Sequence, residues 1–448
     1  MIIDLLPSIL ADYLAGWMFL VLTLLLMAGF PVTFTLMGTA LIFAVIGLDL
    51  AFFDLLPLRL WGMMQNSTFI AVPLFVFMGV MLEKSGLAES LLETMGQLFR
   101  RVRGGLAVSV VVVGALLGAS TGIVGATVVT MGLLALPVML NHGYSKSLAT
   151  GTVAASGTLG QIIPPSIILV LLGDILGVSV GDLFLGAVVP GLILVALYIL
   201  YILIVCRLYP QMAPLVPDSD CSTLNRAFWR RIIKTLLPTL GLMVAVLGSI
   251  FAGIATPTES GAMGAVGATL LALAHGRFSL SVLRHVAQTT TKLTSMVFII
   301  LVGANAFGLV FRGLGGDGVI RDFIENLDFA GWQVLLIVMI LIFFLGFFLD
   351  FIEICFIHIP IAAPIIADYG FDPLWFGILF AINLQTSFMT PPFGFSLFFL
   401  KGVAPSTIRT GHIYRGILPF VGIQLLVLFV VALWPETVTW LPAQIYTP

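Results

Sequence analysis

Three ionisable residues, Asp350, Glu353 and His358, stand close together in an otherwise apolar stretch. Acids surrounded by hydrocarbon side chains are costly, so they indicate a function by default. They could bind a cation, relay a proton or cap the start of a helix. We favour a helix cap, with a secondary role for Asp350 in a cation site. Metal chemistry is not favoured, because the spacing of Glu353 and His358 does not suit two ligands on one helix face and no third ligand is near.

Helix-breaking and polar residues interrupt the apolar sequence at four places, one of which contains Asp350 and Glu353. Adjacent prolines occur in GTLGQIIPPS (157–166) and NLQTSFMTPPFG (383–394), and glycine-rich or acidic breaks occur at 118–122 and 346–353. Each break offers backbone carbonyls, and most add hydroxyls or amides. Hard oxygen ligands of this kind suit a sodium ion. The alternative interpretation is that these glycines pack helices together and these prolines only kink them.

Composition defines the class of protein in which these breaks occur. The chain has 448 residues, of which 60% are hydrophobic and 9% charged, and its mean hydropathy is +1.18. Such a chain is expected to be an all-α polytopic membrane protein. Cys206, Cys221 and Cys355 are scattered and fit neither a disulfide framework nor a metal site. The motifs of P-loop nucleotide hydrolysis, zinc proteases and serine hydrolases do not occur, so we expect no enzyme.

The breaks recur because the chain carries an internal duplication. A shift of 227 residues places Pro164-Pro165 on Pro391-Pro392, and it also aligns Gly86 with Gly313 and Pro137 with Pro364. Each half is expected to hold an amphipathic arm, a hairpin of two short legs and a broken helix. A leg of about 14–18 residues spans roughly 21–27 Å, less than the hydrocarbon core of about 30 Å. The hairpins should therefore be re-entrant, with tips inside the membrane.

The expected organisation is a set of N-terminal scaffold helices, a first inverted repeat, a cytoplasmic loop with connecting helices, a second inverted repeat and a C-terminal tail: 1–66, 67–206, 207–291, 292–434 and 435–448. In the first repeat the arm, hairpin and broken helix are 88–103, 104–140 and 147–177. In the second they are 316–328, 331–366 and 375–401. Between the halves, Thr256-Pro257-Thr258-Glu259 is typical of a capped helix start.

Charge placement agrees with an inverted arrangement of the repeats. The first arm ends in Arg100-Arg101-Val102-Arg103, whereas the second arm is mainly acidic. Positive residues concentrate on the cytoplasmic side of a membrane protein. If hairpin one opens to the cytoplasm and hairpin two to the outside, all of the 19 Lys and Arg residues are cytoplasmic except three: Arg59, Arg312 and Arg321.

Five stretches resemble one family of membrane proteins. They are VPLFVFMGVMLEKSGLAESL, GTLGQIIPPSIILVLLGDILGVSVGDLFLGAVVPG, ATPTESGAMGAVGA, FLGFFLD and MTPPFGFSLF. In these stretches the chain is similar to the large membrane (M) subunit of tripartite ATP-independent periplasmic (TRAP) transporters, the DctM-like large permeases. The likeness extends over most of the chain, from about residue 68 to residue 419.

The resemblance implies an elevator-type transporter of the bacterial inner membrane, with a scaffold and a moving transport domain. Both termini are predicted to be periplasmic. The resemblance also implies sodium as the coupling ion, with no other cofactor. Its implied partners are a small four-helix membrane subunit, a periplasmic substrate-binding protein, an organic anion carrying a carboxylate, and the lipid bilayer. No nucleic acid is expected.

The residue types at the breaks and the resemblance together give one expected site for sodium and substrate. Its members are hydroxyl, amide, acidic, glycine and proline residues at the breaks: Ser120, Thr121, Gly122, Gly157, Thr158, Gly160, Pro164, Asp350, Asn383, Thr390, Pro391 and Gly394. Two short stretches depart from the family pattern. The first tip has Ala119-Ser120-Thr121 where the family often has Ser-Gly-Ser, and Leu349-Asp350-Phe351 replaces the usual Leu-Asp-Pro.

The expected function is therefore sodium-coupled import of organic acids that a binding protein delivers. One alternative is a standalone sodium–carboxylate symporter of the same broad architecture, which needs no binding protein. A remote alternative is an intramembrane enzyme that uses Asp350, Glu353 and His358.

Overall fold

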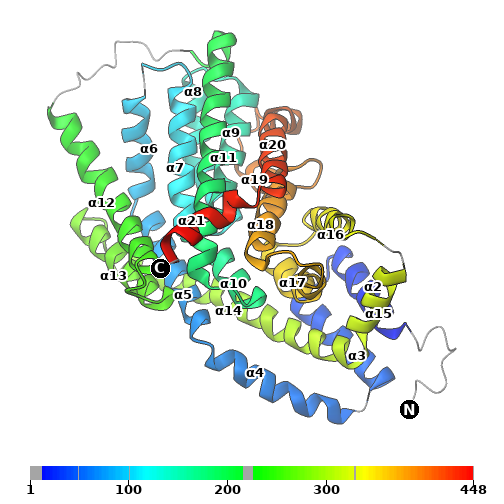
Figure 1. Ribbon diagram of the computed structural model, residues 1–448. Helices are drawn as coiled ribbons and strands as arrows, with labels where there is room; N and C mark the ends of the chain where they lie inside the picture. The colour runs from blue at the N-terminus through cyan, green and yellow to red at the C-terminus, as the bar shows by residue number, and fades with distance from the viewer. Residues whose placement is uncertain (1–12, 49, 100, 215–225, 327–328, 447–448) are drawn as a thin grey trace.

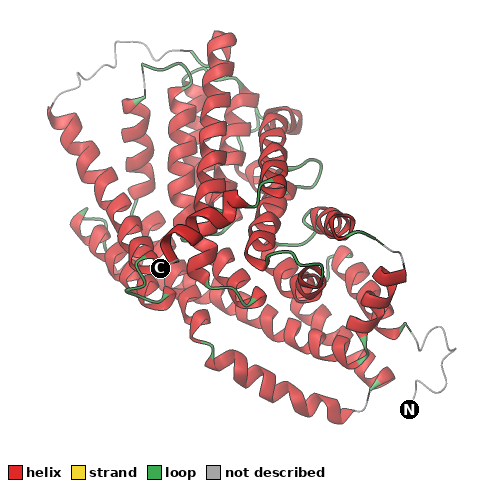
Figure 2. Cartoon of the chain, viewed as in Figure 1, coloured by secondary structure: helices red, strands yellow, loops and turns green. Residues whose placement is uncertain are grey.

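The computed structural model describes residues 13–48, 50–99, 101–214, 226–326 and 329–446. These residues form helices joined by short connections, and they contain no strand (Figure 2). Six described helical segments are long and apolar enough to cross a membrane: Ser67–Lys84, Val124–Asn141, Val180–Leu208, Leu280–Gly313, Phe351–Asp368 and Thr410–Leu433. The all-helical, multi-pass class predicted from composition is confirmed.

The N-terminal group and the first half account for the chain up to residue 208. The N-terminal elements are α2 (Leu14–Met27), α3 (Val32–Gly47), η2 (Leu50–Leu55), α4 (Leu56–Gln65), η3 (Ser67–Ile70) and α5 (Ala71–Lys84). The first half continues with α6 (Leu87–Leu98), α7 (Gly105–Thr121), α8 (Val124–Asn141), α9 (Lys146–Thr158), η4 (Leu159–Gln161), α10 (Ile167–Leu176) and α11 (Val180–Leu208).

A linker and the second half follow. The linker elements are η5 (Pro210–Met212), α12 (Arg226–Phe251) and α13 (Pro257–Ala274). The second half comprises α14 (Leu280–Gly313), α15 (Gly316–Asn326), α16 (Gly331–Leu345), α17 (Phe351–Asp368), α18 (Pro373–Met389), α19 (Phe395–Val403) and α20 (Thr410–Leu433), and α21 (Glu436–Tyr446) comes last. The series α5–α11 and α14–α20 thus share one order: a leading helix, a short arm, two legs, a broken pair and a long helix.

The two pairs of legs lie in different parts of the molecule. In Figure 1, α7 and α8 stand in a bundle with α6, α9 and α11, whereas α16 and α17 lie on the opposite side near α2 and α15. Gly122 ends α7 in the left-handed region with φ of +64°, and the extended Ile123 precedes α8. A residue with a Cβ would be strained at this φ, so glycine permits the tight reversal between the legs.

The halves are joined through a close contact between α9 and α20. A Cβ added to Gly151 would lie 2.1 Å from the Gly416 carbonyl oxygen, and one added to Gly416 would lie 2.0 Å from the Ser147 carbonyl oxygen. Small residues at such positions let two helix backbones approach closely, which is how helices associate in lipid.

The structure corrects two boundaries of the predicted organisation. The boundary between 291 and 292 falls inside α14, which runs unbroken for 34 residues from Leu280. The polar stretch near Lys292 suggested a connection, but polar residues are compatible with a helix end that extends beyond the hydrocarbon. The predicted tail contains a helix, α21, because Val438 is fully buried beside Gly186 of α11.

The α9–α20 contact predicts opposite effects for one substitution at two glycines of α20. Gly416→Ala should destabilise the protein by about 1–3 kcal/mol, because its Cβ overlaps the backbone of α9. In Gly422→Ala the added Cβ has nothing within 4 Å. This variant should be more stable, because alanine within a helix is about 0.5–1 kcal/mol more favourable than glycine. Thermal unfolding in nanodiscs should show a lower Tm for the first variant only. Equal Tm values would contradict the contact.

Candidate functional site

The first break separates α9 from α10. Helix α9 ends at Thr158, a single 3-10 turn follows to Gln161, and α10 begins at Ile167. Ser166 donates its hydroxyl hydrogen to the Gln161 carbonyl oxygen across the Pro-Pro pair at 2.9 Å. Ser166, Gln161 and Thr158 are all buried. The hydroxyl therefore satisfies a carbonyl that the prolines, which have no N–H, leave without a helical partner.

The second break separates α18 from α19 and is built in the same way. Helix α18 ends at Met389, and α19 begins at Phe395. The Ser396 hydroxyl donates to the Phe388 carbonyl oxygen at 2.9 Å. Phe388 is the position that the 227-residue shift pairs with Gln161, so the same carbonyl is satisfied in both halves. The Pro164-Pro165 and Pro391-Pro392 bonds are both cis.

The tip of the first hairpin packs directly on the first break. A Cβ added to Gly160 would lie 2.2 Å from the Gly118 carbonyl group, and one added to Gly122 would lie 3.1 Å from the Ile167 nitrogen. Gly157 packs in the same way on the backbone of Val128. Glycines are required here because the two main chains touch. The side chains of Ser120 and Thr121, both predicted ligands, lie outside the described part of the chain.

The second hairpin is held to the second break by side-chain hydrogen bonds. The Asn383 amide nitrogen donates to the Met339 carbonyl oxygen at 2.8 Å, and the Ser387 hydroxyl donates to the Phe343 carbonyl oxygen at 2.6 Å. Phe343 lies in the last turn of α16, where carbonyls lack a helical partner. Gly346 lies against Ser387, so each hairpin end packs on the break of its own half.

The two breaks meet each other at positions that the duplication makes equivalent. The Gln385 amide nitrogen donates to the Thr158 hydroxyl oxygen at 3.4 Å, and the shift of 227 residues aligns these two residues. The Thr158 hydroxyl also contacts the Met389 sulfur at 3.1 Å. Contact between equivalent positions is typical of an interface around a two-fold axis. Together with the hairpin contacts above, this contact connects the four breaks.

Two buried oxygen atoms at these breaks have no hydrogen-bond partner among the described residues. They are the side-chain amide oxygens of Gln161 and Gln385, which are 1% and 0% exposed. A buried acceptor without a donor costs about 1–3 kcal/mol. Both glutamines therefore present an unused acceptor where the breaks meet.

Asp350 and Glu353 occupy the start of α17, close to the tip of the second hairpin. Asp350 is the N-cap residue, and its backbone N–H donates to a Glu353 carboxylate oxygen at 2.9 Å. This is the arrangement of a capping box. His358 lies further along the helix, 6% exposed, with its ring at 5.4 Å from that of Phe19. Asp350 and His358 are eight residues apart along α17, about 12 Å of helix, so the two side chains do not form one centre.

The remaining predicted site residues lie along the Pro-Pro breaks. Pro164 is buried, whereas Thr390 and Pro391 are partly exposed, and Gly394 packs on the Phe388 carbonyl oxygen. Ser166, Ser396 and Met389 are not among the site residues expected from the sequence. A serine shortly after each Pro-Pro pair was a usable signal for the first two. Met389 gave no signal, because an apolar residue in an apolar run has nothing to distinguish it.

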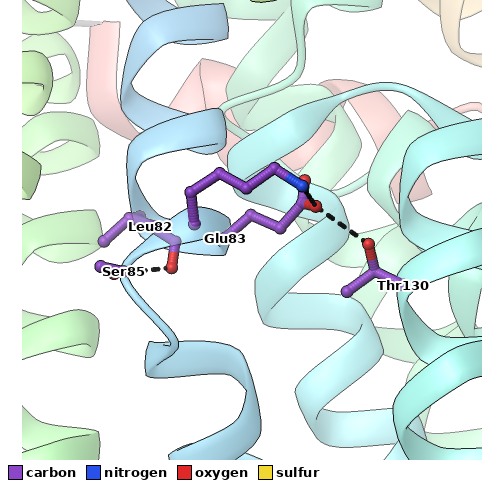
Figure 3. A network of polar contacts seen from close by, with 5 residues as sticks. Leu82, Glu83, Ser85 and Thr130 are labelled. Carbon is purple, nitrogen blue, oxygen red and sulfur yellow. Dashed lines mark hydrogen bonds and ion pairs between the residues drawn. The ribbon is translucent and has the colours of Figure 1, made fainter. Parts of the chain in front are cut away.

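A polar contact also joins the first hairpin to the N-terminal group. Figure 3 shows Glu83 of α5 accepting a hydrogen bond from the Thr130 hydroxyl of α8 at 3.0 Å. Lys84 pairs with the same carboxylate oxygen at 3.0 Å. Asn66 makes a second contact of this type, because its amide donates to Asp174 of α10. Among the described residues, these two polar contacts connect α8 and α10 to the N-terminal group.

The serine contact at the second hairpin gives a testable prediction. Ser387→Ala removes the donor to Phe343 and leaves that carbonyl unsatisfied, which costs about 1–3 kcal/mol. This cost corresponds to a roughly 5- to 150-fold more frequent local opening of the end of α16 and the tip that follows it. Hydrogen–deuterium exchange should therefore speed up in peptides covering 344–350. Ser156→Ala is the matched control, since Ser156 is equally buried but its hydroxyl bonds only within its own helix, to Val153. Unchanged exchange in Ser387→Ala would refute this role.

The chain is similar to known transport proteins over nearly its whole length. The family model described as "Tripartite ATP-independent periplasmic transporter, DctM component" matches residues 19–437. The C4-dicarboxylate TRAP transporter large permease protein DctM of Pseudomonas aeruginosa is 32% identical over 388 residues, covering 86% of this chain and 89% of that protein. The sialic acid TRAP transporter large permease protein SiaM of Vibrio cholerae is 28% identical over 423 residues, covering 93% and 96%.

A solved structure shares the fold at low sequence identity. The crystal structure of the YdaH transporter of Alcanivorax borkumensis aligns with a TM-score of 0.64 at 15% identity, covering 93% of this chain and 98% of that one. The match of the family model to most of the chain decides the family. This chain belongs to the DctM component family of tripartite ATP-independent periplasmic transporters, and it is a membrane transport subunit rather than an enzyme.

Proposed function

We propose that this chain is the transmembrane subunit of a sodium-coupled importer of organic acids in the bacterial inner membrane. It would work with a small four-helix membrane subunit and with a periplasmic binding protein that delivers the substrate. The names of the two relatives support the substrate class, because C4-dicarboxylates and sialic acid both carry carboxylates.

The observation that carries sodium coupling is the pair of unpaired oxygens on Gln161 and Gln385. Two acceptors without donors, buried where two helix breaks meet, favour a bound cation, and hard oxygen ligands suit sodium. Thr158 and the carbonyls near Gly118 and Gly160 supply further oxygens of the same kind. These residues would hold the ion, and a positive charge there would offset the cost of the unsatisfied acceptors.

The same breaks provide a place for an anion. Helices α10 and α19 both begin at the breaks, at Ile167 and Phe395, and the first N–H groups of a helix have no helical partner. Helix N-termini attract negative groups for this reason and because of the helix dipole. Cation and anion would therefore bind side by side, and each would lower the cost of placing the other in a low-dielectric site.

Alternating access would come from movement of one part of the molecule against the other. In this proposal α7–α11 and α16–α20 move together, because the breaks and the α9–α20 contact join them. The frame would consist of α2–α5 and α12–α14, with α6 and α15 as connecting arms. The few polar contacts between the two parts, such as Glu83 with Thr130, suit a surface that must slide.

Sodium coupling predicts a clear result in reconstituted vesicles. The complex of this chain with its two partners should accumulate a carboxylate substrate when sodium is high outside and should not do so under a proton gradient alone. Equal uptake with either gradient would refute sodium coupling. Uptake by this chain alone, without the binding protein, would instead favour a standalone symporter.

The two glutamines extend this prediction to residues. Gln161→Leu and Gln385→Leu each remove one proposed oxygen ligand, so half-maximal uptake should require roughly tenfold more sodium, equivalent to about 1.4 kcal/mol. Gln288→Leu is the control, because Gln288 is exposed on α14. An unchanged sodium requirement in both site variants would exclude these side chains as ligands.

The proposed movement can be tested by cross-linking across the sliding surface. Cysteines at Glu83 and Thr130, in a chain without its native cysteines, should be linked by a short bifunctional thiol reagent and should then stop transport. Cysteines at Lys146 and Thr407 are the control, because this exposed contact lies within the proposed moving part. Full transport after complete linking of Glu83 to Thr130 would contradict the movement.

A further inference from the structure

A cavity of about 620 Å³ lies between the proposed frame and the proposed moving part. Helices α4 and α14 form one wall, and α10, α17 and the start of α18 form the other. The cavity follows α17 from Ala367 to Phe356. This is roughly 16 Å of helix at 1.5 Å per residue, and it leads towards the tip of the second hairpin.

Two arginines line this cavity without an acidic partner. Arg59 comes from α4 and Arg312 from α14, two helices that pack on each other. Among the residues that the structure describes, neither guanidinium has a carboxylate within ion-pair distance. Among those residues, the Arg312 side chain donates one weak hydrogen bond, from Nε to the Gly308 carbonyl oxygen at 3.3 Å. Partial burial, and then the charge of Arg312, lowers the pKa of Arg59. The two positive charges therefore repel each other.

The position of these arginines is unusual for the whole chain. Arg59, Arg312 and Arg321 are the three basic residues that the charge pattern places on the outer side of the membrane. Arg321 has a local structural explanation, because it pairs with Asp368 at 2.6 Å, and it does not line this cavity. Arg59 and Arg312 have no such explanation, although basic residues are disfavoured on that side.

The two described acids that line the cavity, Asp174 and Asp317, form no ion pair with either arginine. Asp174 accepts a hydrogen bond from the Asn66 side-chain amide. Asp317 stands in the first turn of α15, where the positive end of the helix dipole stabilises a negative charge. Both acids therefore have a local source of stabilisation, whereas the two arginines would gain one from an added anion.

We infer that Arg59 and Arg312 together bind the carboxylate of the arriving organic anion in this cavity, before it reaches the clustered breaks. A guanidinium presents a planar set of donors that matches a carboxylate, and such charge-assisted bonds are the strong ones. The site rests on the proposed function, because it assigns residues to the capture of the proposed substrate class. It also places a fixed capture point on the frame, facing the part proposed to move.

The test is chemical footprinting of the complex in nanodiscs, which needs no transport. Phenylglyoxal modifies accessible arginines, and mass spectrometry measures the rate at each one. Succinate should slow modification of Arg59 and Arg312 roughly fivefold or more, as expected for a charge-assisted contact. Uncharged succinamide, and sodium chloride at matched ionic strength, should not do so. Arg321 is the internal control, and succinate should leave its rate unchanged.

Variants separate a shared site from two independent ones. In Arg312→Gln, succinate should no longer protect Arg59, and in Arg59→Gln it should no longer protect Arg312. Arg312→Lys should restore part of the protection, because it keeps the charge but loses the planar fork. Equal protection by chloride, or full protection of Arg59 in Arg312→Gln, would overturn the inference.

This outcome is distinct from that of the proposed function. Sodium-driven uptake by the wild-type complex with no succinate protection would overturn the arginine site and leave the importer standing. Protection of both arginines together with uptake driven by protons alone would overturn sodium coupling and leave the arginine site standing.

Discussion

Every interruption of a helix inside a membrane protein must find hydrogen-bond partners within the protein, because hydrocarbon offers none. This chain meets that requirement by packing its breaks against one another. The Gly118 and Gly160 backbones touch, and Ser166 and Ser396 satisfy equivalent carbonyls across the two Pro-Pro pairs. The irregular segments are therefore mutually dependent, and none of them could be buried alone without leaving polar backbone groups unsatisfied.

The duplication explains why these segments meet at one place. Thr158 and Gln385 are equivalent positions in the two halves, and they contact each other directly. An interface of this kind needs only one self-complementary surface, which both copies then supply. The two copies differ at this contact, because Thr158 contributes a hydroxyl and Gln385 an amide. The side-chain oxygens of Gln161 and Gln385, one from each half, have no hydrogen-bond partner among the described residues.

Much of this arrangement could be predicted from particular residues. Two adjacent prolines remove two backbone donors, so the Pro-Pro breaks were visible in the sequence. The end of the first tip was visible through Gly122, whose left-handed φ favours glycine. The Thr256–Glu259 capping box was also predicted and is confirmed, because it depends only on local spacing. The length of α14 and the burial of α21 were missed, since both depend on distant packing partners. The cavity could not be predicted, because Arg59 and Arg312 are 253 residues apart and only the fold brings them together.

The two halves also differ in how far their breaks are buried. Gln161, Pro164 and Ser166 are buried, whereas Pro392 and Phe393 of the second break are exposed beside a cavity of about 430 Å³. Two copies related by an exact two-fold axis would be equally exposed. In this conformation the two halves therefore share the same order of elements but differ in how far their breaks are exposed. In the proposed cycle the halves would exchange these environments, while the contact between the equivalent residues Thr158 and Gln385 stays intact.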